Sequence, residues 1–569
     1  MTEKPWLKTY PKHLDWHFTP PVAPVHALLD EAVEKYGSRP YLDFLDRKFT
    51  YAEVGTLAAR AARGFQKLGV GKGVHVGLFF TNCPQFVICL YGVLKAGGTV
   101  VNFSPLYSRR ELLTQAEDSE TGMLATLNLA GLLGPARTLL DESRVDCLIV
   151  GSLSEVMRFP KSLIYQVAWR KSICAIPEGP SYVRFRDLID NDGIYDVPDI
   201  DPQNDIAFLQ YTGGTTGTPK GAMLTHANIY SNVLQGERWD PEVSYGAERY
   251  IGALPFFHAF ALTGIVLGAA RLGAEIIIHP KFELEDVVRD IDRKKVTILP
   301  GVPTMFAAIN NHPDLEKYDL TSLRRCVSGG APLPREVKEK FEARAGCVIT
   351  EGYGLTETSP TVAVTPIDGT YKEGSVGLPL PGTMVKITDL EDPRKELPVG
   401  ETGEICVSGP QVMKGYWRRP EETAETIVDG YLRTGDIGYL DGDGYLFIVD
   451  RKKDMILVGG FNVFPRTIEE AIYRHPAVRE VTVIGVPDDY LGERPKAFVV
   501  LKDPDHPLPE EALLAFLRER LGKHELPREI EFRTELPKTI IGKLSKKELV
   551  EEDRARSKSA PAPAGDGGS

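Results

Sequence analysis

Helical and strand patterns of apolar residues alternate along most of this chain. Apolar residues recur at helical spacing over residues 24–37 and 51–69, and each of these two segments ends in a glycine. Short β-rich runs at 75–80, 99–103 and 147–152 predict strands. The alternation predicts an α/β fold with mostly parallel sheets, in which ligands bind beyond the carboxyl ends of the strands.

The pattern changes near residue 450. Gly-Asp pairs and alternating apolar positions over residues 430–450 predict β-hairpins, and the sequence that follows alternates strand, loop, helix and strand at a higher charge density. We therefore predict a large N-terminal body of α/β subdomains with a β-rich subdomain over residues 1–449, and a small α+β domain over residues 450–552. Residues 553–569 have the composition of a disordered tail.

Length and composition exclude several classes of protein. With 569 residues the chain is too long for one hydrophobic core, and 67 basic against 79 acidic residues give a formal charge of -12, which argues against a nucleic-acid partner. The seven cysteines are scattered and form no C-x-x-C, so we expect neither a zinc site nor a disulfide framework. Neither a secretion signal nor a membrane-spanning apolar run is recognisable. These features favour a cytoplasmic protein.

Residues 159–171 combine basic and aromatic side chains at helical spacing. We favour an ordinary surface helix with a buried apolar face. The alternative is an amphipathic segment that contacts a membrane surface, which would place the protein peripherally on the inner membrane. The sequence also leaves a homodimer open.

One glycine-rich segment has the composition of a phosphate-binding loop. Residues 211–226 contain four glycines, five threonines and Lys220, directly after the apolar run 205–210. Glycines let successive backbone N–H groups converge on an anion, hydroxyls add donors, and the lysine adds a mobile positive charge. Because Lys220 follows Pro219 rather than a glycine, the segment is not a Walker loop. The pattern predicts a polyphosphate site.

Residues 211–221 resemble the phosphate loop of the adenylate-forming superfamily, which includes acyl-CoA synthetases, luciferases and peptide-synthetase adenylation domains. The resemblance continues in the same order through six further motifs, at residues 254–260, 328–334, 351–358, 430–436, 450–465 and 537–543. It extends over nearly the whole chain. It implies an enzyme that couples a carboxylic acid to AMP, with ATP, Mg²⁺ and CoA as ligands.

The resemblance implies a role in nucleotide binding for each matching residue. The phosphates would be held by Thr212, Gly213, Gly214, Thr215, Thr216, Gly217 and Lys220. The wall against which adenine lies would be formed by Gly329, Gly330, Ala331, Glu351, Gly352, Tyr353 and Gly354. Glu357 would bind Mg²⁺ together with Thr215, and Thr356 would contact the α-phosphate. Asp436 and Arg451 would bind the ribose.

The resemblance also implies a two-step reaction with a domain movement. Lys543 would bridge the α-phosphate and the substrate carboxylate, where a compact cation opposes the charge that develops in the transition state. The small domain would then rotate about a hinge at Asp450, so that the loop with Gly459 and Gly460 borders the entry path of CoA. His258 would lie between the acyl substrate, the phosphate and the thiol path, as a gate.

The acyl site should lie among residues 256–270, 301–309 and 328–333, which are apolar or small, and Phe306 with the nearby glycines would shape a slot. This lining favours an aliphatic acid, and the full length resembles bacterial medium- and long-chain fatty acid CoA ligases. A dicarboxylate CoA ligase of the pimeloyl type and a fatty acyl-AMP ligase that loads a carrier protein stay open as alternatives. A noncatalytic nucleotide- or lipid-binding protein of the same fold is the alternative from another class.

Overall fold

The computed structural model describes residues 4–212, 219–367, 371–488, 490–503, 506, 508–538 and 544–559. The chain divides into two compact units. The first comprises Met1–Lys386, Cys406–Thr434 and Leu440–Leu446, and the second comprises Ile387–Ile405, Gly435–Tyr439 and Phe447–Ser569. The domain boundary and the hinge at Asp450 stay predictions.

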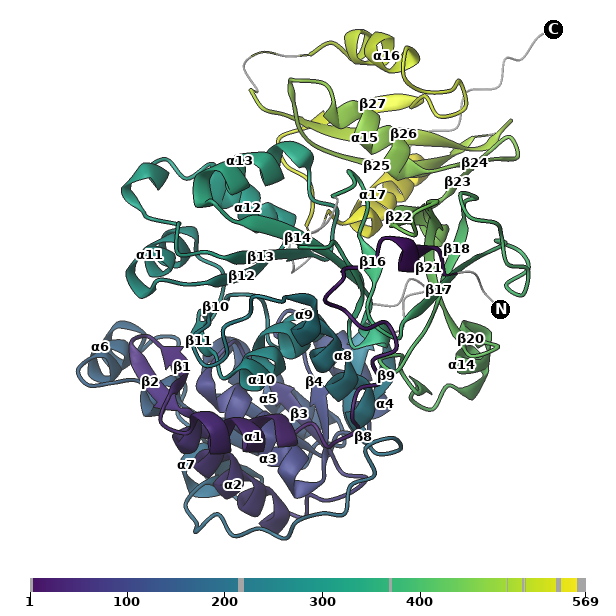
Figure 1. Ribbon diagram of the computed structural model, residues 1–569. Helices are drawn as coiled ribbons and strands as arrows, with labels where there is room; N and C mark the ends of the chain where they lie inside the picture. The colour runs from purple at the N-terminus through teal and green to yellow at the C-terminus, as the bar shows by residue number, and fades with distance from the viewer. Residues whose placement is uncertain are drawn as a thin grey trace, which may run out of the picture. The chain divides into compact units, whose positions relative to one another are not determined.

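A nine-stranded sheet carries several of the predicted motifs (Figure 1). Its order is β16-β15-β14-β13-β12-β10-β11-β1-β2. Its strands are β1 (Pro40–Phe44), β2 (Arg47–Thr50), β10 (Arg249–Gly252), β11 (Glu275–Ile278), β12 (Ile298–Gly301), β13 (Arg325–Gly329), β14 (Val348–Gly354), β15 (Thr361–Val364) and β16 (Leu378–Pro379). The inner strands from β1 to β14 pair in parallel, whereas β2, β15 and β16 are antiparallel edge strands. The predicted α/β class is confirmed, and the carboxyl ends of β10, β12, β13 and β14 share one edge.

An eight-stranded sheet completes the first unit and contains the strands predicted near the N-terminus. Its order is β19-β9-β8-β4-β3-β5-β6-β7. Its strands are β3 (His75–Phe79), β4 (Thr99–Asn102), β5 (Met123–Leu127), β6 (Cys147–Gly151), β7 (Tyr182–Arg184), β8 (Ile206–Thr212), β9 (Lys220–Thr225) and β19 (Gly415–Tyr416). The strands from β8 to β7 pair in parallel, and β9 and β19 extend the sheet antiparallel.

Helices alternate with these strands, as the apolar pattern predicts. α2 begins after Thr50, whose hydroxyl accepts a hydrogen bond from Glu53 N at 3.2 Å, while the Glu53 carboxylate accepts one from Thr50 N at 2.7 Å. The helices of the first unit are α1 (Ala27–Tyr36), α2 (Tyr51–Lys67), α3 (Pro84–Ala96), α4 (Arg109–Asp118), α5 (Ala130–Glu142), α6 (Lys161–Ala168), α7 (Phe185–Leu188), α8 (His226–Trp239), α9 (Ala259–Ala261), α10 (Gly268–Leu272), α11 (Leu284–Lys294), α12 (Pro303–Asn310), α13 (Arg335–Ala345) and α14 (Pro420–Thr426). A buried π-helix, Leu262–Leu267, joins α9 to α10.

Two smaller sheets form the rest of the chain. The predicted β-rich subdomain has the order β17-β18-β21-β20, with β22 paired to β21. Its strands are β17 (Met384–Thr388), β18 (Gly403–Ser408), β20 (Ile427–Val428), β21 (Tyr431–Leu440) and β22 (Leu446–Arg451). The C-terminal sheet has the order β24-β23-β26-β25, with β27 paired to β26. Its elements are β23 (Ile456–Val458), β24 (Phe461–Val463), α15 (Pro465–Tyr473), β25 (Val478–Asp488), β26 (Gly492–Leu501), α16 (Glu510–Arg518), β27 (Glu529–Arg533) and α17 (Lys546–Ser559).

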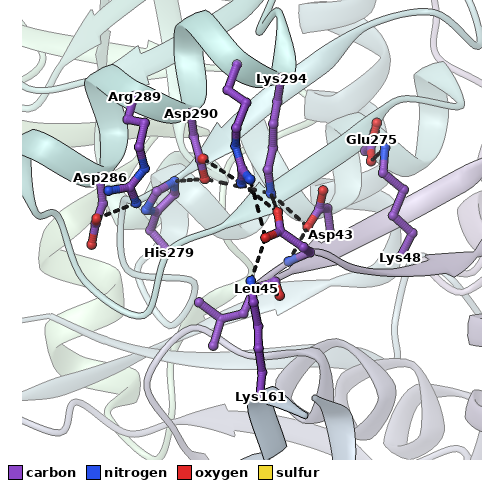
Figure 2. A network of polar contacts seen from close by, with 12 residues as sticks. Asp43, Leu45, Lys48, Lys161, Glu275, His279, Asp286, Arg289, Asp290 and Lys294 are labelled. Atoms are coloured by element: carbon purple, nitrogen blue, oxygen red, sulfur yellow. Dashed lines mark hydrogen bonds and ion pairs between the residues drawn. The ribbon is translucent and has the colours of Figure 1, made fainter. Parts of the chain in front are cut away.

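A cluster of charged side chains joins β1 to α11 (Figure 2). Asp43 in β1 is 1% exposed, and its carboxylate lies 2.9 Å from Lys294 Nζ in α11. The same ammonium lies 3.1 Å from Asp46 and 3.7 Å from Asp290, which in turn lies 3.4 Å from His279 Nε2. Burial opposes the charge of Lys294, but the carboxylates outweigh it and raise the pKa of the lysine. The ammonium therefore stays charged beside the buried carboxylates of Asp43 and Asp290.

Two neutral histidines lie near the N-terminal end of α1. His226 is 2% exposed, and its Nδ1 accepts a hydrogen bond from Val25 N at 3.0 Å. Both ring nitrogens of His26 are buried, and neither contacts a hydrogen-bond partner among the described residues. Burial lowers the pKa of each imidazole to about 3, with a smaller repulsion from Lys95 on His26 and from His26 on His226.

We expect this histidine pair to make the protein sensitive to mild acid. An unfolded histidine binds a proton near pH 6.5, whereas these two bind one only near pH 3, so the unfolded chain binds more protons between these values. The free energy of unfolding therefore contains the full contribution of these two histidines above pH 6.5. Below this pH it decreases by up to about 1.4 kcal/mol per pH unit for each imidazole. Urea denaturation midpoints between pH 7.5 and pH 5 measure the loss.

The variant His26→Leu should show a weaker pH dependence of this midpoint, because it removes one of the two groups that must gain a proton. His17→Leu is the matched control, since His17 is exposed and its substitution should leave the dependence unchanged. Equal slopes for the wild type and His26→Leu would contradict the assignment.

Helix α6 differs from the surface helix favoured by the sequence. None of its side chains is buried, so the expected buried apolar face is wrong. Lys161 attaches its first turn to the body, with Nζ 2.5 Å from the Asp46 carboxylate. The large apolar side chains exposed in and beside α6 are Phe159, Leu163, Ile164, Val167 and Trp169, each at least 54% exposed. Within the described part of the chain, no helix is long and apolar enough to span a membrane.

Candidate active site

Strands β8 and β9 carry the two ends of the predicted phosphate loop. They pair antiparallel, and the register places Thr212 directly opposite Lys220. The predicted contacts that lie outside the described residues are Gly213, Gly214, Thr215, Thr216 and Gly217. The hairpin ends on the carboxyl side of β8, where an α/β sheet binds its ligands.

Lys220 and Glu357, predicted to bind the phosphates and Mg²⁺, meet at one aromatic side chain. Glu357 lies in the short helix Thr356–Thr358, and its Oε1 accepts a hydrogen bond from the Tyr416 hydroxyl at 2.8 Å. Lys220 Nζ lies 5.3 Å from the centroid of the Tyr416 ring and forms an ion pair with Glu422 in α14. The structure therefore brings the two predicted charged residues into one cluster.

The two strand ends predicted to bind adenine are neighbours in the nine-stranded sheet. β13 and β14 pair in parallel, with Gly329 opposite Gly352. A methyl group on Gly352 would meet no atom within 4 Å, so this position leaves room for a flat ring. Gly354 differs, because a methyl group there would lie 1.9 Å from the Pro360 carbonyl oxygen. The same two strand ends also carry Gly330, Ala331, Glu351 and Tyr353.

His258 follows β10 and precedes the short helix α9. Its Nδ1 accepts a hydrogen bond from Phe260 N at 3.3 Å. Two buried side-chain amides fix the backbone before His258. The Asn82 amide donates to the carbonyl groups of Gly252 and Leu254, at 3.1 and 2.8 Å. The Gln210 amide donates to the Phe257 carbonyl at 2.5 Å. Gln210 interrupts the apolar run of β8, and this polar residue was the sequence signal that could have identified it.

Phe306, predicted to shape the acyl slot, is fully buried in α12. Its ring packs edge to face on Phe341, with ring centroids 5.0 Å apart. A methyl group on Gly301 would lie 3.1 Å from the Phe306 ring. These are contacts of a core residue, and a role in acyl binding stays a prediction.

In the second unit, the two residues predicted for the ribose form an ion pair. Arg451 Nε lies 3.0 Å from Asp436 Oδ1, and Asp436 is 4% exposed. Asp450, the predicted hinge, is also buried, and its carboxylate accepts hydrogen bonds from Arg451 N at 2.7 Å and from Arg466 N in α15 at 2.8 Å. Burial raises the pKa of Asp450 despite these hydrogen bonds. The Asp450 side chain therefore ties β22 to the start of α15.

The predicted CoA loop is a tight β-hairpin. Val458 in β23 pairs with Phe461 in β24, which leaves Gly459 and Gly460 as the two residues of the turn. Their φ angles are 57° and 86°, and a two-residue turn of this kind needs positive φ at both positions. Glycine is therefore required here by the backbone. Lys543 lies outside the described residues.

The donor set at Glu357 fits Mg²⁺. Mg²⁺ commonly binds to one or two protein carboxylates and completes its shell with water and substrate phosphates. Glu357 offers one half-buried carboxylate beside the end of the phosphate hairpin. Among the described residues no group of three or more histidine, cysteine or acidic side chains could hold a metal ion, so a cage made only of protein is absent from that part of the chain.

Sequence reasoning did not identify Tyr416 and Glu422. Glu422 stands beside Glu421 in the first turn of α14, where an acidic residue is expected to stabilise the helix end. Tyr416 lies in a two-residue strand that has no strong local pattern. Only the pairing of β19 with β9 places the two residues beside the phosphate hairpin.

A mostly parallel α/β body whose β8–β9 hairpin carries the predicted phosphate loop, followed by a small C-terminal α+β part, is the architecture expected of a nucleotide-binding enzyme. The chain belongs to the AMP-binding enzyme family: the family's sequence model matches residues 29–417, and that of the AMP-binding enzyme C-terminal domain matches residues 467–543. The predicted superfamily is thereby confirmed.

Full-length relatives have names and ligands that bear on the function. The long-chain-fatty-acid–CoA ligase of Bacillus subtilis (strain 168) is 42% identical over 555 residues, which cover 97% of this chain and 98% of that protein. The crystal structure of ATP-bound MatB from Rhodopseudomonas palustris has a TM-score of 0.81 at 29% identity and covers 93% of this chain and 99% of that one. O-succinylbenzoate CoA synthetase of Bacillus subtilis, in complex with ATP and a magnesium ion, has a TM-score of 0.74 at 27% identity, with 92% and 98% covered.

Proposed function

We propose that this enzyme is a long-chain fatty acid CoA ligase. It would couple a fatty acid to AMP with release of pyrophosphate, and then transfer the acyl group to the thiol of CoA. One observation carries the proposal: the chain is 42% identical over nearly its full length to a long-chain-fatty-acid–CoA ligase. The contact of Lys220 and Glu357 with Tyr416, at the end of the phosphate hairpin, supports it.

In the first step, a carboxylate oxygen of the fatty acid attacks the α-phosphorus of ATP. A new oxygen–phosphorus bond forms, and the bond to pyrophosphate breaks. Both reactants are anions, so the site must offset their charge. Lys220 would face the β- and γ-phosphates that leave, and Glu357 would hold Mg²⁺, which supplies further positive charge when bound.

In the second step, the CoA thiolate attacks the carbonyl carbon and AMP leaves with the electrons of the broken bond. We propose that the thiol reaches this carbon past His258 and the Gly459–Gly460 turn. The turn exposes backbone without a β-carbon, which lets a slender chain approach closely. Asp450 would be the point about which the C-terminal part moves between the two steps.

The test is exchange of labelled pyrophosphate into ATP, measured with butanoic to octadecanoic acids and with dicarboxylates, followed by product analysis with CoA. We expect exchange to be fastest with long-chain acids and acyl-CoA to form only when CoA is added. A maximum with dicarboxylates would favour the pimeloyl type, and transfer only to a holo carrier protein would favour the acyl-AMP ligase. No exchange with any acid would contradict the proposal.

We further propose that α6 contacts a lipid surface. The substrate is a lipid that partitions into membranes, and the exposed apolar side chains of α6 are flanked by basic ones, as in helices that lie in the interface of anionic membranes. The flanking cations are Arg158, Arg170 and Lys171, all exposed, whereas Lys161 is paired with Asp46. An anionic membrane matches this arrangement, because its hydrocarbon interior is apolar and its headgroup surface is negatively charged.

Leu163→Ser with Val167→Ser should weaken sedimentation with phosphatidylglycerol vesicles by at least about tenfold, because each of these side chains would lose most of its apolar burial in lipid. The control is Ile194→Ser with Val197→Ser, which removes two aliphatic side chains that are 73% and 77% exposed elsewhere. If the α6 variant and the control variant bind these vesicles equally well, α6 is not the contact. If the wild type binds neutral phosphatidylcholine vesicles as well as phosphatidylglycerol vesicles, the cations have no role.

A further inference from the structure

The segment from Gly415 to Glu422 lies beside both charged residues of the candidate phosphate site. Strand β19 pairs antiparallel with β9, and the register places Tyr416 opposite Ala222, two residues after Lys220. Backbone hydrogen bonds fix this register: Trp417 N donates to the Gly221 carbonyl at 2.8 Å. Tyr416 is 8% exposed, so its ring is held in one place.

One tyrosine side chain contacts two groups of opposite charge. Its hydroxyl donates to Glu357 Oε1 at 2.8 Å, and its ring lies under the Lys220 ammonium, 5.3 Å from centroid to Nζ. The hydroxyl fixes the direction of one carboxylate oxygen, and the face of the ring attracts a cation. Tyr416 therefore sets the positions of both groups relative to the end of the hairpin.

Glu422 is held against Lys220 by contacts of its own segment. Thr423 Oγ1 donates to the Arg419 carbonyl at 2.7 Å and accepts a hydrogen bond from Tyr416 N at 2.9 Å, which fixes the turn before α14. Arg419 Nε lies 3.5 Å from Glu422, and the Arg419 guanidinium also pairs with Asp118 at 2.5 Å. The Glu422 carboxylate therefore lies in a fixed position when it pairs with the lysine.

Tyr211 connects the same network to the strand that enters the phosphate loop. Its hydroxyl donates to Asp118 Oδ2 at 2.6 Å, and Asp118 is the carboxylate that pairs with Arg419. The network therefore runs from β8, through α4 and the segment before α14, to Lys220 in β9. Both strands that flank the loop are tied to the residues that hold its lysine.

We infer that Tyr416 and Glu422 are positioning residues of the phosphate site. Tyr416 holds the Glu357 carboxylate and the Lys220 ammonium in place, and Glu422 neutralises this ammonium until the nucleotide phosphates replace it. The inference rests on the proposed function, because it requires that Lys220 and Glu357 act on a nucleotide. It adds a competition: ATP must displace a carboxylate that is already paired with the lysine.

Glu422→Gln should tighten ATP binding, because the amide keeps the shape of the side chain and removes the competing charge. We expect the KM and the Kd for ATP to fall about two- to fivefold, which is the range for a partly exposed ion pair, while kcat changes less than either. Glu421→Gln is the matched control: it changes the net charge equally, on an exposed side chain of the same helix. The Kd is measured without fatty acid, by displacement of a fluorescent ATP analogue.

Tyr416→Phe keeps the ring beneath Lys220 and removes the hydroxyl that holds Glu357. We expect the Mg²⁺ concentration for half-maximal rate to rise and kcat to fall about tenfold, while the KM for ATP stays nearly constant. Tyr416→Leu removes the ring as well and should also raise this KM. Tyr230→Phe is the control, because its hydroxyl donates to Glu31 at 3.1 Å outside the site.

If the wild type is active, two results would overturn the inference. The first is a Glu422→Gln variant that binds ATP no more tightly than the wild type. The second is a Tyr416→Phe variant with the same Mg²⁺ dependence as the wild type. A general loss of packing would lower the melting temperature and change all kinetic constants together, which also counts against a positioning role. If Tyr416→Phe does not fold, the Kd for ATP of Glu422→Gln, which leaves Tyr416 intact, still decides the competition for Lys220. A wild type without acid-dependent pyrophosphate exchange contradicts the proposed function instead.

Discussion

Replacing Lys543 by alanine is expected to slow acyl-adenylate formation by about 10²–10³-fold, the effect of removing one preorganised group that stabilises charge in a transition state. In the role that the family resemblance implies, its ammonium would oppose the negative charge that concentrates on the α-phosphate and the attacking carboxylate as the new bond forms. The second step has a different charge distribution, because the thiolate attacks a carbonyl and AMP leaves. Thioester formation from pre-made acyl-adenylate should therefore change little.

The two half-reactions are measured separately, by pyrophosphate exchange and by release of AMP from synthetic acyl-adenylate with CoA. Lys547→Ala is the control, because Lys547 is an exposed lysine of α17 close in sequence. Lys543→Arg should restore little, since a guanidinium is larger and planar and does not replace a compact ammonium. An equal loss of both half-reactions in Lys543→Ala would remove the proposed role of this lysine.

Lys294→Met is expected to destabilise the first unit by about 3–5 kcal/mol, the cost of leaving a buried carboxylate without its partner. Asp43 is 1% exposed, and Lys294 is the cation that its carboxylate contacts among the described residues. The same lysine also pairs with Asp46 and Asp290. Figure 2 shows Lys294 together with Asp43 and Asp290 in this cluster. In this variant, Asp46 and Asp290 would keep their ion pairs with Arg293. The cost therefore falls mainly on Asp43, which lies where water screens its charge weakly.

Chemical unfolding followed by far-ultraviolet circular dichroism measures this loss. Lys295→Met is the matched control: Lys295 pairs with Asp292 and Asp319 at 3.0 Å each, but its side chain is 52% exposed, so the cost should stay below about 1 kcal/mol. Adding Asp43→Asn to Lys294→Met should recover much of the stability, because it removes the unpaired charge. Equal effects of Lys294→Met and Lys295→Met would refute a buried charge cluster.

The sequence identifies several glycines of the candidate site correctly, but for some of them the physical reason for glycine differs from the one inferred. Gly352 leaves open space on its side of β14, which agrees with the reason inferred for the adenine wall. At Gly354 the Pro360 carbonyl excludes any side chain, and at Gly459 and Gly460 the turn requires positive φ. These three glycines are required by the fold itself, whatever ligand binds beside them.

The order of helices and strands, and the placement of the phosphate loop directly after β8, could be predicted because apolar periodicity and glycine content are local properties of the chain. The exposed face of α6 could not, because whether an amphipathic helix is covered depends on what else packs there. The role of Asn82 was missed for a related reason: a buried amide is recognised by the carbonyl groups it reaches, and these lie on another segment.

By itself the sequence determined the fold class, the family and the chemical type of the site, since each depends on residue types and short spacings. Only the tertiary structure decided that Tyr416 contacts both Lys220 and Glu357. It also decided that Glu422 forms an ion pair with Lys220, and that Lys294 neutralises Asp43. These contacts join residues far apart in the chain, and they depend on strand order and register. Crossover connections set that order, and no local pattern of side chains records it.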